Sequence, residues 1–167
     1  MTTGNEATDL VLFGTQGDLA RRKLLPALYQ LEKAEQLHPD TRIIGVAKRE
    51  LDSEGFRQQM QESIGEFVDE ALCDDAMARL LGKLHYLSLD LTESAAYRQL
   101  AALRKERGVP LVSYFAVPAA IYGDICAGLS AAKLIDSQSR VVLEKPIGHD
   151  LESSRQINDQ VAEYFSE

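Results

Sequence analysis

The chain of 167 residues carries 18 lysines and arginines against 26 aspartates and glutamates, a formal net charge of −8. Because nucleic-acid binding requires a basic face that neutralises phosphates, this acidic balance argues against a nucleic-acid partner. The composition, with 45% hydrophobic and 26% charged residues, is typical of a globular protein, and the length suits a single domain over residues 1–167.

No membrane, secretion or metal signal stands out in the sequence. No apolar run approaches the roughly 20 residues that cross a bilayer, and residues 1–8 are polar, without the apolar stretch of a secretory signal. Cys73 and Cys126 stand far apart and in no metal-ligand spacing, which favours ordinary buried or half-buried thiols. We expect a soluble, cytoplasmic protein with no membrane partner and no metal site.

Short apolar runs alternate with segments of helical spacing along the chain. The predicted strands are residues 9–14, 41–47, 84–88, 111–117 and 140–144. The predicted helices are residues 18–33, a helix from 53 through 64, and residues 69–81, 92–107, 119–133 and 150–165. In the first helix Leu19, Leu24, Leu25, Leu28 and Leu31 recur at helical spacing, and Pro26 should bend or break it near Leu25. The alternation predicts an α/β fold: a Rossmann-type, doubly wound parallel sheet with helices on both faces.

The turn after the first strand has the character of a phosphate-binding turn. Gly14 allows a tight turn, Gly17 lets the backbone approach a pyrophosphate, and Asp18 can cap the following helix. The spacing is neither G-x-G-x-x-G nor a Walker A loop, so a plain strand-to-helix turn is the alternative. The cations Arg21, Arg22 and Lys23 oppose the dipole of a first turn, which suggests a compensating anion, although a solvated helix face is also typical.

The end of the second strand carries two cations, Lys48 and Arg49. In dinucleotide folds an acid at this place binds the 2′-hydroxyl of NAD, whereas a cation accommodates the 2′-phosphate of NADP. The pattern favours NADP as the cofactor. NAD is left open, because two exposed cations at a strand end are common and Glu50 follows them.

Three stretches, at residues 17–29, 113–118 and 144–151, resemble signatures of the glucose-6-phosphate dehydrogenase family. Residues 17–29, GDLARRKLLPALY, resemble GDLAxRKLxPxLY, and residues 144–151, EKPIGHDL, resemble EKPxGxDL. Between them, SYFAVP at residues 113–118 is similar to a Y-x-A-x-P-P segment, with Ala119 replacing the second proline. The resemblance covers residues 9–165, nearly the whole chain.

This resemblance implies a Rossmann-type coenzyme domain that is followed, outside this chain, by an α+β substrate domain. It implies oxidation of glucose 6-phosphate to the 6-phosphogluconolactone, the first step of the pentose phosphate pathway, with hydride passing to NADP in a homo-oligomer. The residues implied to contact coenzyme are Gly14, Thr15, Gln16, Gly17, Asp18, Leu19, Lys48, Arg49, Tyr86, Ala116, Val117, Pro118, Tyr122, Glu144 and Lys145. Lys23 and Lys145 are implied to approach the sugar phosphate, and Lys48 stands where the family usually has arginine.

No catalytic residue is assigned within this chain. The family's catalytic histidine and its R-I-D-H-Y-L-G-K-E stretch do not occur, and His38, His85 and His149 fit structural or exposed roles better. We therefore expect coenzyme binding without turnover, and an apolar face where a substrate domain would dock. The alternatives are an NAD-dependent dehydrogenase of another sugar phosphate and a stand-alone Rossmann module that senses a nucleotide or binds a partner.

Overall fold

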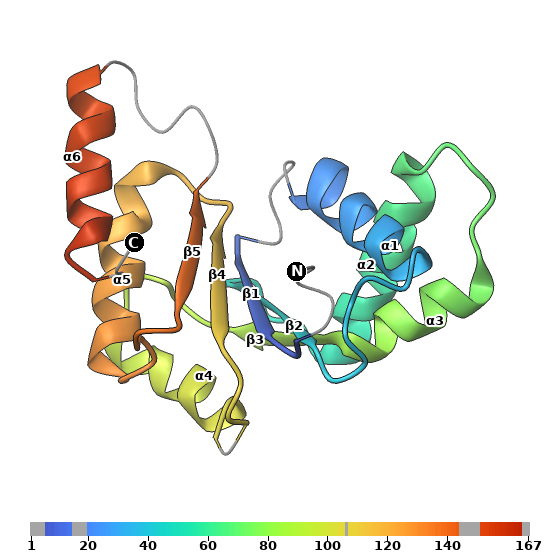
Figure 1. Ribbon diagram of the computed structural model, residues 1–167, viewed down its shortest axis with the longest axis horizontal. Helices are drawn as coiled ribbons and strands as arrows, with labels where there is room; N and C mark the ends of the chain where they lie inside the picture. The colour runs from blue at the N-terminus through green and yellow to red at the C-terminus, as the bar shows by residue number, and fades with distance from the viewer. Residues whose placement is uncertain (1–5, 15–19, 106, 144–150, 165–167) are drawn as a thin grey trace.

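A five-stranded parallel sheet forms the centre of the molecule in the computed structural model, which describes residues 6–14, 20–105, 107–143 and 151–164 (Figure 1). The strand order is β3-β2-β1-β4-β5. The strands are β1 (Asp9–Phe13), β2 (Arg42–Ala47), β3 (Leu84–Ser88), β4 (Leu111–Phe115) and β5 (Arg140–Leu143). The chain moves outward from β1 to one side and then crosses to β4 on the other, which confirms the predicted doubly wound α/β fold.

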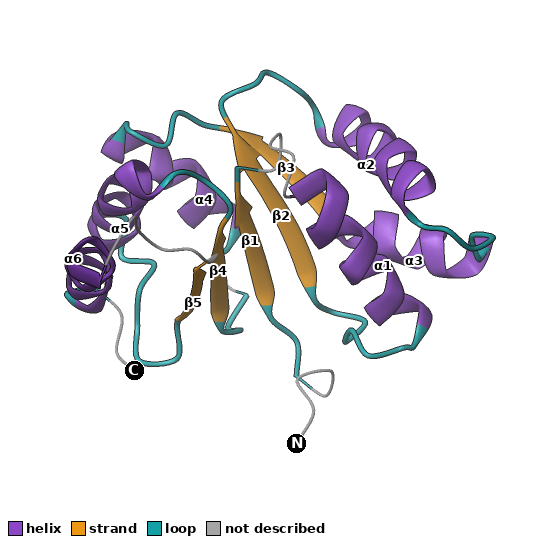
Figure 2. Cartoon of the chain, turned by 90° about the horizontal axis from the view of Figure 1, so that it is seen from above, coloured by secondary structure: helices purple, strands orange, loops and turns teal. Residues whose placement is uncertain are grey.

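Helices cover both faces of the sheet, as Figures 1 and 2 show. One face carries α1 (Leu25–Lys33), α2 (Ser53–Phe67) and α3 (Asp74–Lys83). The other carries α4 (Arg98–Leu103), α5 (Tyr122–Ala131) and α6 (Leu151–Ala162). Single turns of π- or 3₁₀-helix precede three of these helices, at Ala20–Leu24, Ser94–Tyr97 and Ala119–Ile121. No helix within the described part of the chain is long and apolar enough to span a membrane.

The alternating side chains of the central strand divide the core into two clusters. Val11 and Phe13 of β1 point into the cluster under α4 and α5, where Phe115 meets Phe13 edge to face. Leu12, between them in sequence, points into the cluster under α1, α2 and α3. The central strands β1 and β2 are buried on both sides, which explains why their apolar residues run without alternating with polar ones.

The helix predicted over residues 18–33 changes type within its length. A π-helical turn, Ala20–Leu24, precedes α1, and Pro26 lies in the first turn of α1, where its missing N–H costs little. The change from π-helix to α-helix between Leu24 and Leu25 falls where the sequence predicted a bend or a break. The α-helix α1 begins at Leu25, and the face that it buries against the core consists of Leu25, Leu28, Tyr29 and Glu32. Leu31, predicted on the apolar face, is instead exposed.

Two helices are shorter than the sequence pattern predicted. The segment predicted over residues 69–81 begins as a helix only at Asp74, because Glu70 is drawn across to α1 by Gln30 (2.6 Å) and Lys33 (2.9 Å). The segment predicted over residues 92–107 ends at Leu103. The third and fourth helices predicted from the sequence are thus shortened where residues bind partners far away in the chain. The strand predicted over 111–117 ends at Phe115.

A buried carboxylate holds the amino end of the sheet together. Asp9, at the start of β1, is fully buried and forms ion pairs with Arg42 (3.1 Å), Arg104 (3.0 Å) and Arg107 (2.8 Å). Burial opposes the ionised carboxylate, but hydrogen bonds from the arginines more than offset it, so the pKa of Asp9 lies below its usual range. Arg104 and Arg107 belong to the segment that was predicted to be helical, and their bonds to Asp9 accompany its early end.

The expected apolar docking face is not formed by the described residues. Their large exposed apolar side chains are Leu31, on α1, and Val142, on the edge strand β5. These two lie on different elements and form no continuous patch. Cys126 is buried as expected, and burial raises the pKa of its thiol to about 11, whereas Cys73 is exposed.

Candidate functional site

The carboxyl ends of β2, β1 and β4 lie side by side and are joined by backbone hydrogen bonds. The Gly14 N–H donates to the Val46 carbonyl and the Ala116 N–H donates to the Phe13 carbonyl, both at 2.9 Å. Because β1 lies between β2 and β4, this edge is the point where the strand order reverses. In open α/β sheets ligands bind outside the strand ends at this point.

Gly14 occupies a position that admits only glycine. Its φ is +93°, in the region that residues with a Cβ avoid. A Cβ built there would lie 2.5 Å from the carbonyl oxygen of Ala116 and 2.6 Å from Cγ1 of Val117. Gly14 is therefore packed directly against the residues that follow β4, and the chain leaves β1 at the glycine that the sequence indicated.

The two cations predicted to read the ribose are exposed at the end of β2. The Lys48 side chain is 83% exposed, and its Nζ lies 3.8 Å from a carboxylate oxygen of Asp90. Arg49 is also exposed. Both cations can thus be reached by an anionic ligand that lies over the strand ends.

Two side chains of β3 bind the backbone of residues 47–49, the segment that carries these cations. The Tyr86 hydroxyl donates to the Arg49 carbonyl at 2.6 Å and to the Ala47 carbonyl at 3.3 Å. The Ser88 hydroxyl donates to the Lys48 carbonyl at 3.2 Å. Sequence reasoning did not assign this role to either side chain. The available signal was a pair of hydroxyl residues two positions apart at the end of the third strand.

The other predicted contacts at this edge differ in their exposure. Ala116 and Val117 are half-buried, and Pro118 is exposed. Tyr86 and Tyr122 are only 6% and 3% exposed, and the Tyr122 ring packs 5.2 Å from Phe115, with burial raising the pKa of its hydroxyl. Both tyrosines therefore lie within the core beneath the edge, and their direct contact with a coenzyme stays a prediction.

The three cations at residues 21–23 differ in their contacts: Arg21 and Arg22 contact α2, whereas Lys23 is exposed to solvent. Arg21 Nε donates to the Ser63 hydroxyl at 3.3 Å, and the Arg22 guanidinium lies 5.3 Å from the centre of the Phe67 ring. Both contacts tie the π-helical turn to α2. Lys23 is exposed and has no partner in the part of the chain that the structure describes, so it is the member of the run that is open to a ligand.

Several predicted site residues lie outside the described residues. They are Thr15, Gln16, Gly17, Asp18 and Leu19 of the first turn, and Glu144 and Lys145 after β5. His149 lies in the same undescribed range. Their predicted roles in binding stay predictions.

The two described histidines have local contacts. His38 Nδ1 accepts a hydrogen bond from the Asp40 N–H at 3.0 Å, which closes the predicted turn. His85 is half-buried, and burial, together with the positive charges of Arg42 and Arg57, lowers its pKa. Neither histidine lies at the carboxyl edge of the sheet, since His85 is near the start of β3 and His38 precedes β2.

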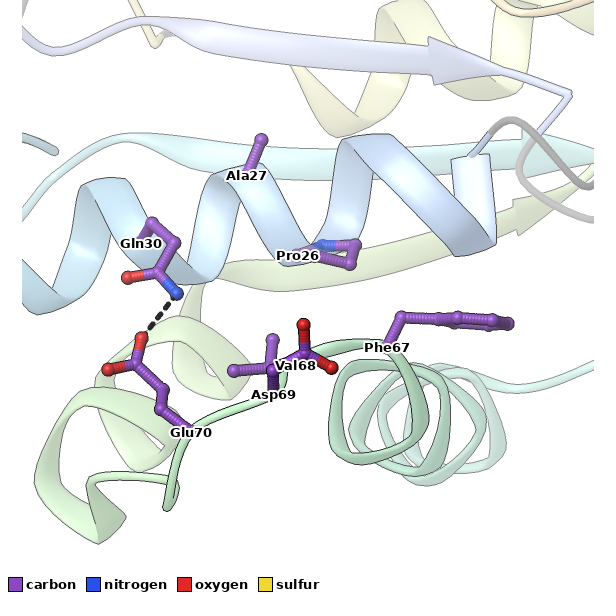
Figure 3. A pocket seen from close by; sticks show the side chains of 7 residues that line it. All are labelled: Pro26, Ala27, Gln30, Phe67, Val68, Asp69 and Glu70. Atoms are coloured by element: carbon purple, nitrogen blue, oxygen red, sulfur yellow. Dashed lines mark hydrogen bonds between the residues drawn. The ribbon is translucent and has the colours of Figure 1, made fainter.

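A depression of about 430 Å³ lies elsewhere, between α1 and the connection from α2 to α3 (Figure 3). It is lined by Pro26, Ala27, Gln30, Phe67, Val68, Asp69 and Glu70. Its carboxylates and amide are on the surface, and Glu70 is already bound by Gln30 and Lys33. The depression holds no nucleophile or cation facing it, so the carboxyl edge is the better candidate site.

The strand order, the reversal at β1 and the glycine turn define a Rossmann-type dinucleotide-binding domain. The sequence matches the family "Glucose-6-phosphate dehydrogenase, NAD binding domain" over residues 11–167. The chain therefore belongs to the glucose-6-phosphate dehydrogenase family, as its motifs indicated, and corresponds to the domain of that family that binds a nicotinamide cofactor.

Individual relatives agree with this assignment. The chain is 44% identical over its whole length to a glucose-6-phosphate 1-dehydrogenase of Dickeya dadantii, and 45% identical over 95% of its length to one of Mycolicibacterium smegmatis. It spans about a third of each of these relatives, 34% and 33%. A crystal structure of the Mycobacterium avium enzyme superposes with a TM-score of 0.86 at 35% identity, over 95% of this chain and 34% of that one. A glucose-6-phosphate dehydrogenase solved in complex with glucose 6-phosphate gives 0.80 at 29% identity, over 96% of this chain and 35% of that one.

Proposed function

We propose that this chain is the coenzyme-binding domain of an NADP-dependent glucose-6-phosphate dehydrogenase. The observation that carries the preference for NADP is the pair of exposed cations, Lys48 and Arg49, at the end of β2 beside the Gly14 turn. A 2′-phosphate bound there meets two positive charges, whereas the 2′-hydroxyl of NAD gains nothing comparable. The enzyme as a whole is proposed to oxidise glucose 6-phosphate to 6-phosphoglucono-1,5-lactone.

The residues of this chain bind and orient in this proposal, and the bound coenzyme supplies the ring that accepts hydride. Gly14 keeps the start of the turn free of side-chain atoms, so that Thr15, Gln16, Gly17, Asp18 and Leu19 can meet the pyrophosphate. Ala116, Val117 and Pro118 are proposed to border the path toward the nicotinamide, and Glu144 is proposed to contact the nicotinamide side of the coenzyme. Lys23 and Lys145 attract the sugar phosphate.

The remaining two thirds of the relatives' length is proposed to provide the substrate domain and the base that removes the hydroxyl proton. The chain alone is accordingly proposed to bind coenzyme without turnover. A homo-oligomeric full-length protein and a cytoplasmic location belong to the same proposal. Mixing the purified chain with glucose 6-phosphate and NADP should therefore produce no absorbance of NADPH.

The coenzyme preference can be tested with a double substitution, Lys48→Ala with Arg49→Ala. Hydrogen bonds to charged groups contribute about 1.5–3 kcal/mol, and exposure reduces this, so affinity for NADP should fall by roughly tenfold or more. Affinity for NAD should stay nearly constant. Both dissociation constants are measurable by titration calorimetry or by quenching of protein fluorescence.

A matched control removes two exposed cations elsewhere, Arg98→Ala with Lys105→Ala. It changes the net charge equally, and it should leave the ratio of the two affinities unaltered. Equal affinity of the unaltered chain for NADP and NAD, or equal losses for both in the double variant, would count against the NADP assignment. A dehydrogenase that uses NAD would then be the better interpretation, with the identity of the sugar phosphate left untouched by this result.

A further inference from the structure

The backbone carbonyls of residues 47–49, at the end of β2 and just after it, are all bound by β3 or by Leu89, which follows β3. Ala47 accepts from the Leu89 N–H at 2.9 Å and from the Tyr86 hydroxyl at 3.3 Å. Lys48 accepts from Ser88 at 3.2 Å. Arg49 accepts from the Tyr86 hydroxyl at 2.6 Å, the shortest of these contacts. Connecting segments are ordinarily more mobile than the strands they follow, and these bonds hold this one in place.

Tyr86 is itself fixed within the core. Its ring lies 5.0 Å from that of Phe56, and its backbone N–H donates to the Ser53 hydroxyl at 3.2 Å. Phe56 in turn fills the space above Gly45, where a Cβ would lie 2.5 Å from the Phe56 ring. Burial also raises the pKa of Tyr86, so its hydroxyl keeps the proton that it donates. The hydroxyl therefore projects from a rigid base into the segment above it.

The side chain of Lys48 is oriented from the same region. Asp90, which follows β3, lies 3.8 Å from the Lys48 ammonium. Its carboxylate accepts hydrogen bonds from the Thr92 N–H at 3.0 Å and the Thr92 hydroxyl at 2.7 Å. Backbone and side chain of the cationic segment are thus both positioned by residues 86–92.

We propose that Tyr86, with Ser88 as its weaker partner, is a positioning residue that sets the preference of this site for a ribose 2′-phosphate. This inference rests on the proposed function. A bound anion gains most from cations whose backbone is already ordered, because no further conformational entropy is lost on binding. Tyr86 acts through the backbone of Lys48 and Arg49 and does not itself touch the phosphate.

The test compares two ligands that differ only in the 2′-phosphate, adenosine 2′,5′-bisphosphate and adenosine 5′-monophosphate. In Tyr86→Phe, which removes only the hydroxyl, affinity for the bisphosphate should fall roughly two- to tenfold, as expected for one hydrogen bond. Affinity for the monophosphate should stay unchanged. A merely structural role would lower both affinities together.

Tyr97→Phe is the matched control. Its hydroxyl also donates to a backbone carbonyl, that of Leu91 at 2.8 Å, and its ring is fully buried in the cluster on the opposite face of the sheet. This variant should lose a similar amount of stability in urea unfolding and keep the ratio of the two affinities. Should Tyr86→Phe fail to fold, Ser88→Ala decides, because its hydroxyl bond is exposed and its loss should lower only the bisphosphate affinity.

The outcomes separate the inference from the function on which it rests. If the unaltered chain binds both ligands equally, the NADP assignment fails and this inference fails with it. If the unaltered chain prefers the bisphosphate and Tyr86→Phe keeps the full preference, or loses affinity for both ligands alike, only the positioning role is overturned. A selective loss in Tyr86→Phe, absent from Tyr97→Phe, supports it.

Discussion

Cations lie at both ends of the central sheet, but they are largely buried at the amino end and exposed at the carboxyl end. At the amino end, Arg42, Arg104 and Arg107 surround Asp9, and their side chains are 17%, 13% and 24% exposed. At the carboxyl end, Lys48 is 83% exposed, and the Asp90 that faces it is itself 36% exposed. The arginines are neutralised from within the fold, whereas the exposed cations remain able to meet an anion from solution.

The arginines of the amino end also bind backbone. Arg42 donates to the Leu103 carbonyl at 2.9 Å and Arg107 donates to the Asp40 carbonyl at 2.6 Å. Arg42 thus joins the end of α4 to the buried carboxylate, and Arg107 joins the connection before β2 to it, which makes this end a structural centre. Charge by itself thus does not identify a binding site, because the two ends differ in how deeply the cations and their carboxylate partner are buried.

The largest effect is expected from Asp9→Asn. The substitution leaves three partly buried guanidinium groups without their counter-charge, and breaking a buried ion pair typically costs about 3–5 kcal/mol. Urea unfolding should show this loss, whereas Asp159→Asn on the exposed face of α6 should have little effect. The ratio of NADP to NAD affinity should not change in folded protein. Unchanged stability in Asp9→Asn would contradict a structural role for the amino end.

Because the Asp9 carboxylate is ionised and paired in the folded protein, we expect the stability of the protein to fall at acidic pH. The pKa of Asp9 is lower in the folded protein than the usual unfolded value of about 3.9. The contribution of the Asp9 carboxylate to the free energy of unfolding is therefore fully present above pH 3.9, about the unfolded pKa, and is lost as the pH falls through the folded pKa. Asp9→Asn should lack this part of the acid sensitivity, and measuring urea midpoints in a series of acidic buffers would detect the difference.

An intermediate effect is expected from Gly14→Ala at the carboxyl end. The new Cβ would contact Ala116 and Val117 at 2.5 and 2.6 Å in a backbone conformation that alanine avoids, at a cost of about 1–3 kcal/mol. Coenzyme affinity should also fall, because the turn must shift. Gly108→Ala is the control: its φ is +63°, but a Cβ there meets nothing within 4 Å. If the two variants are equally stable and bind coenzyme equally, the close contacts at Gly14 do not explain why glycine stands at this position.

The smallest effect concerns His85, which lies near the arginines of the amino end. The pKa of His85 in the folded protein lies below the unfolded value of about 6.5. Burial is the largest cause, and the positive charges of Arg42 and Arg57 add to it. The unfolded chain then binds more protons, so stability should decline as the pH falls below that value. His85→Gln should remove this decline in the free energy of unfolding. A difference between variant and unaltered chain that is equal at neutral and acidic pH would argue against this assignment.

The sequence by itself determined the alternation of strands and helices, the glycine turn and the family. These follow from properties that act between near neighbours: apolar runs that fit a sheet buried on both faces, a helix that Pro26 interrupts, and a residue without Cβ at the strand end. The cations after β2 were also readable, because their place relative to the strand end is a local feature.

Tertiary structure alone decided the rest. Arg104 and Arg107 meet Asp9 across 95 and 98 positions, and helix α4 ends before them. Tyr86, predicted to line the coenzyme path, holds the Arg49 carbonyl across 37 positions from within the core. Such contacts depend on which strands become neighbours, a choice made by the packing of the whole chain, so no local pattern of residues could reveal them.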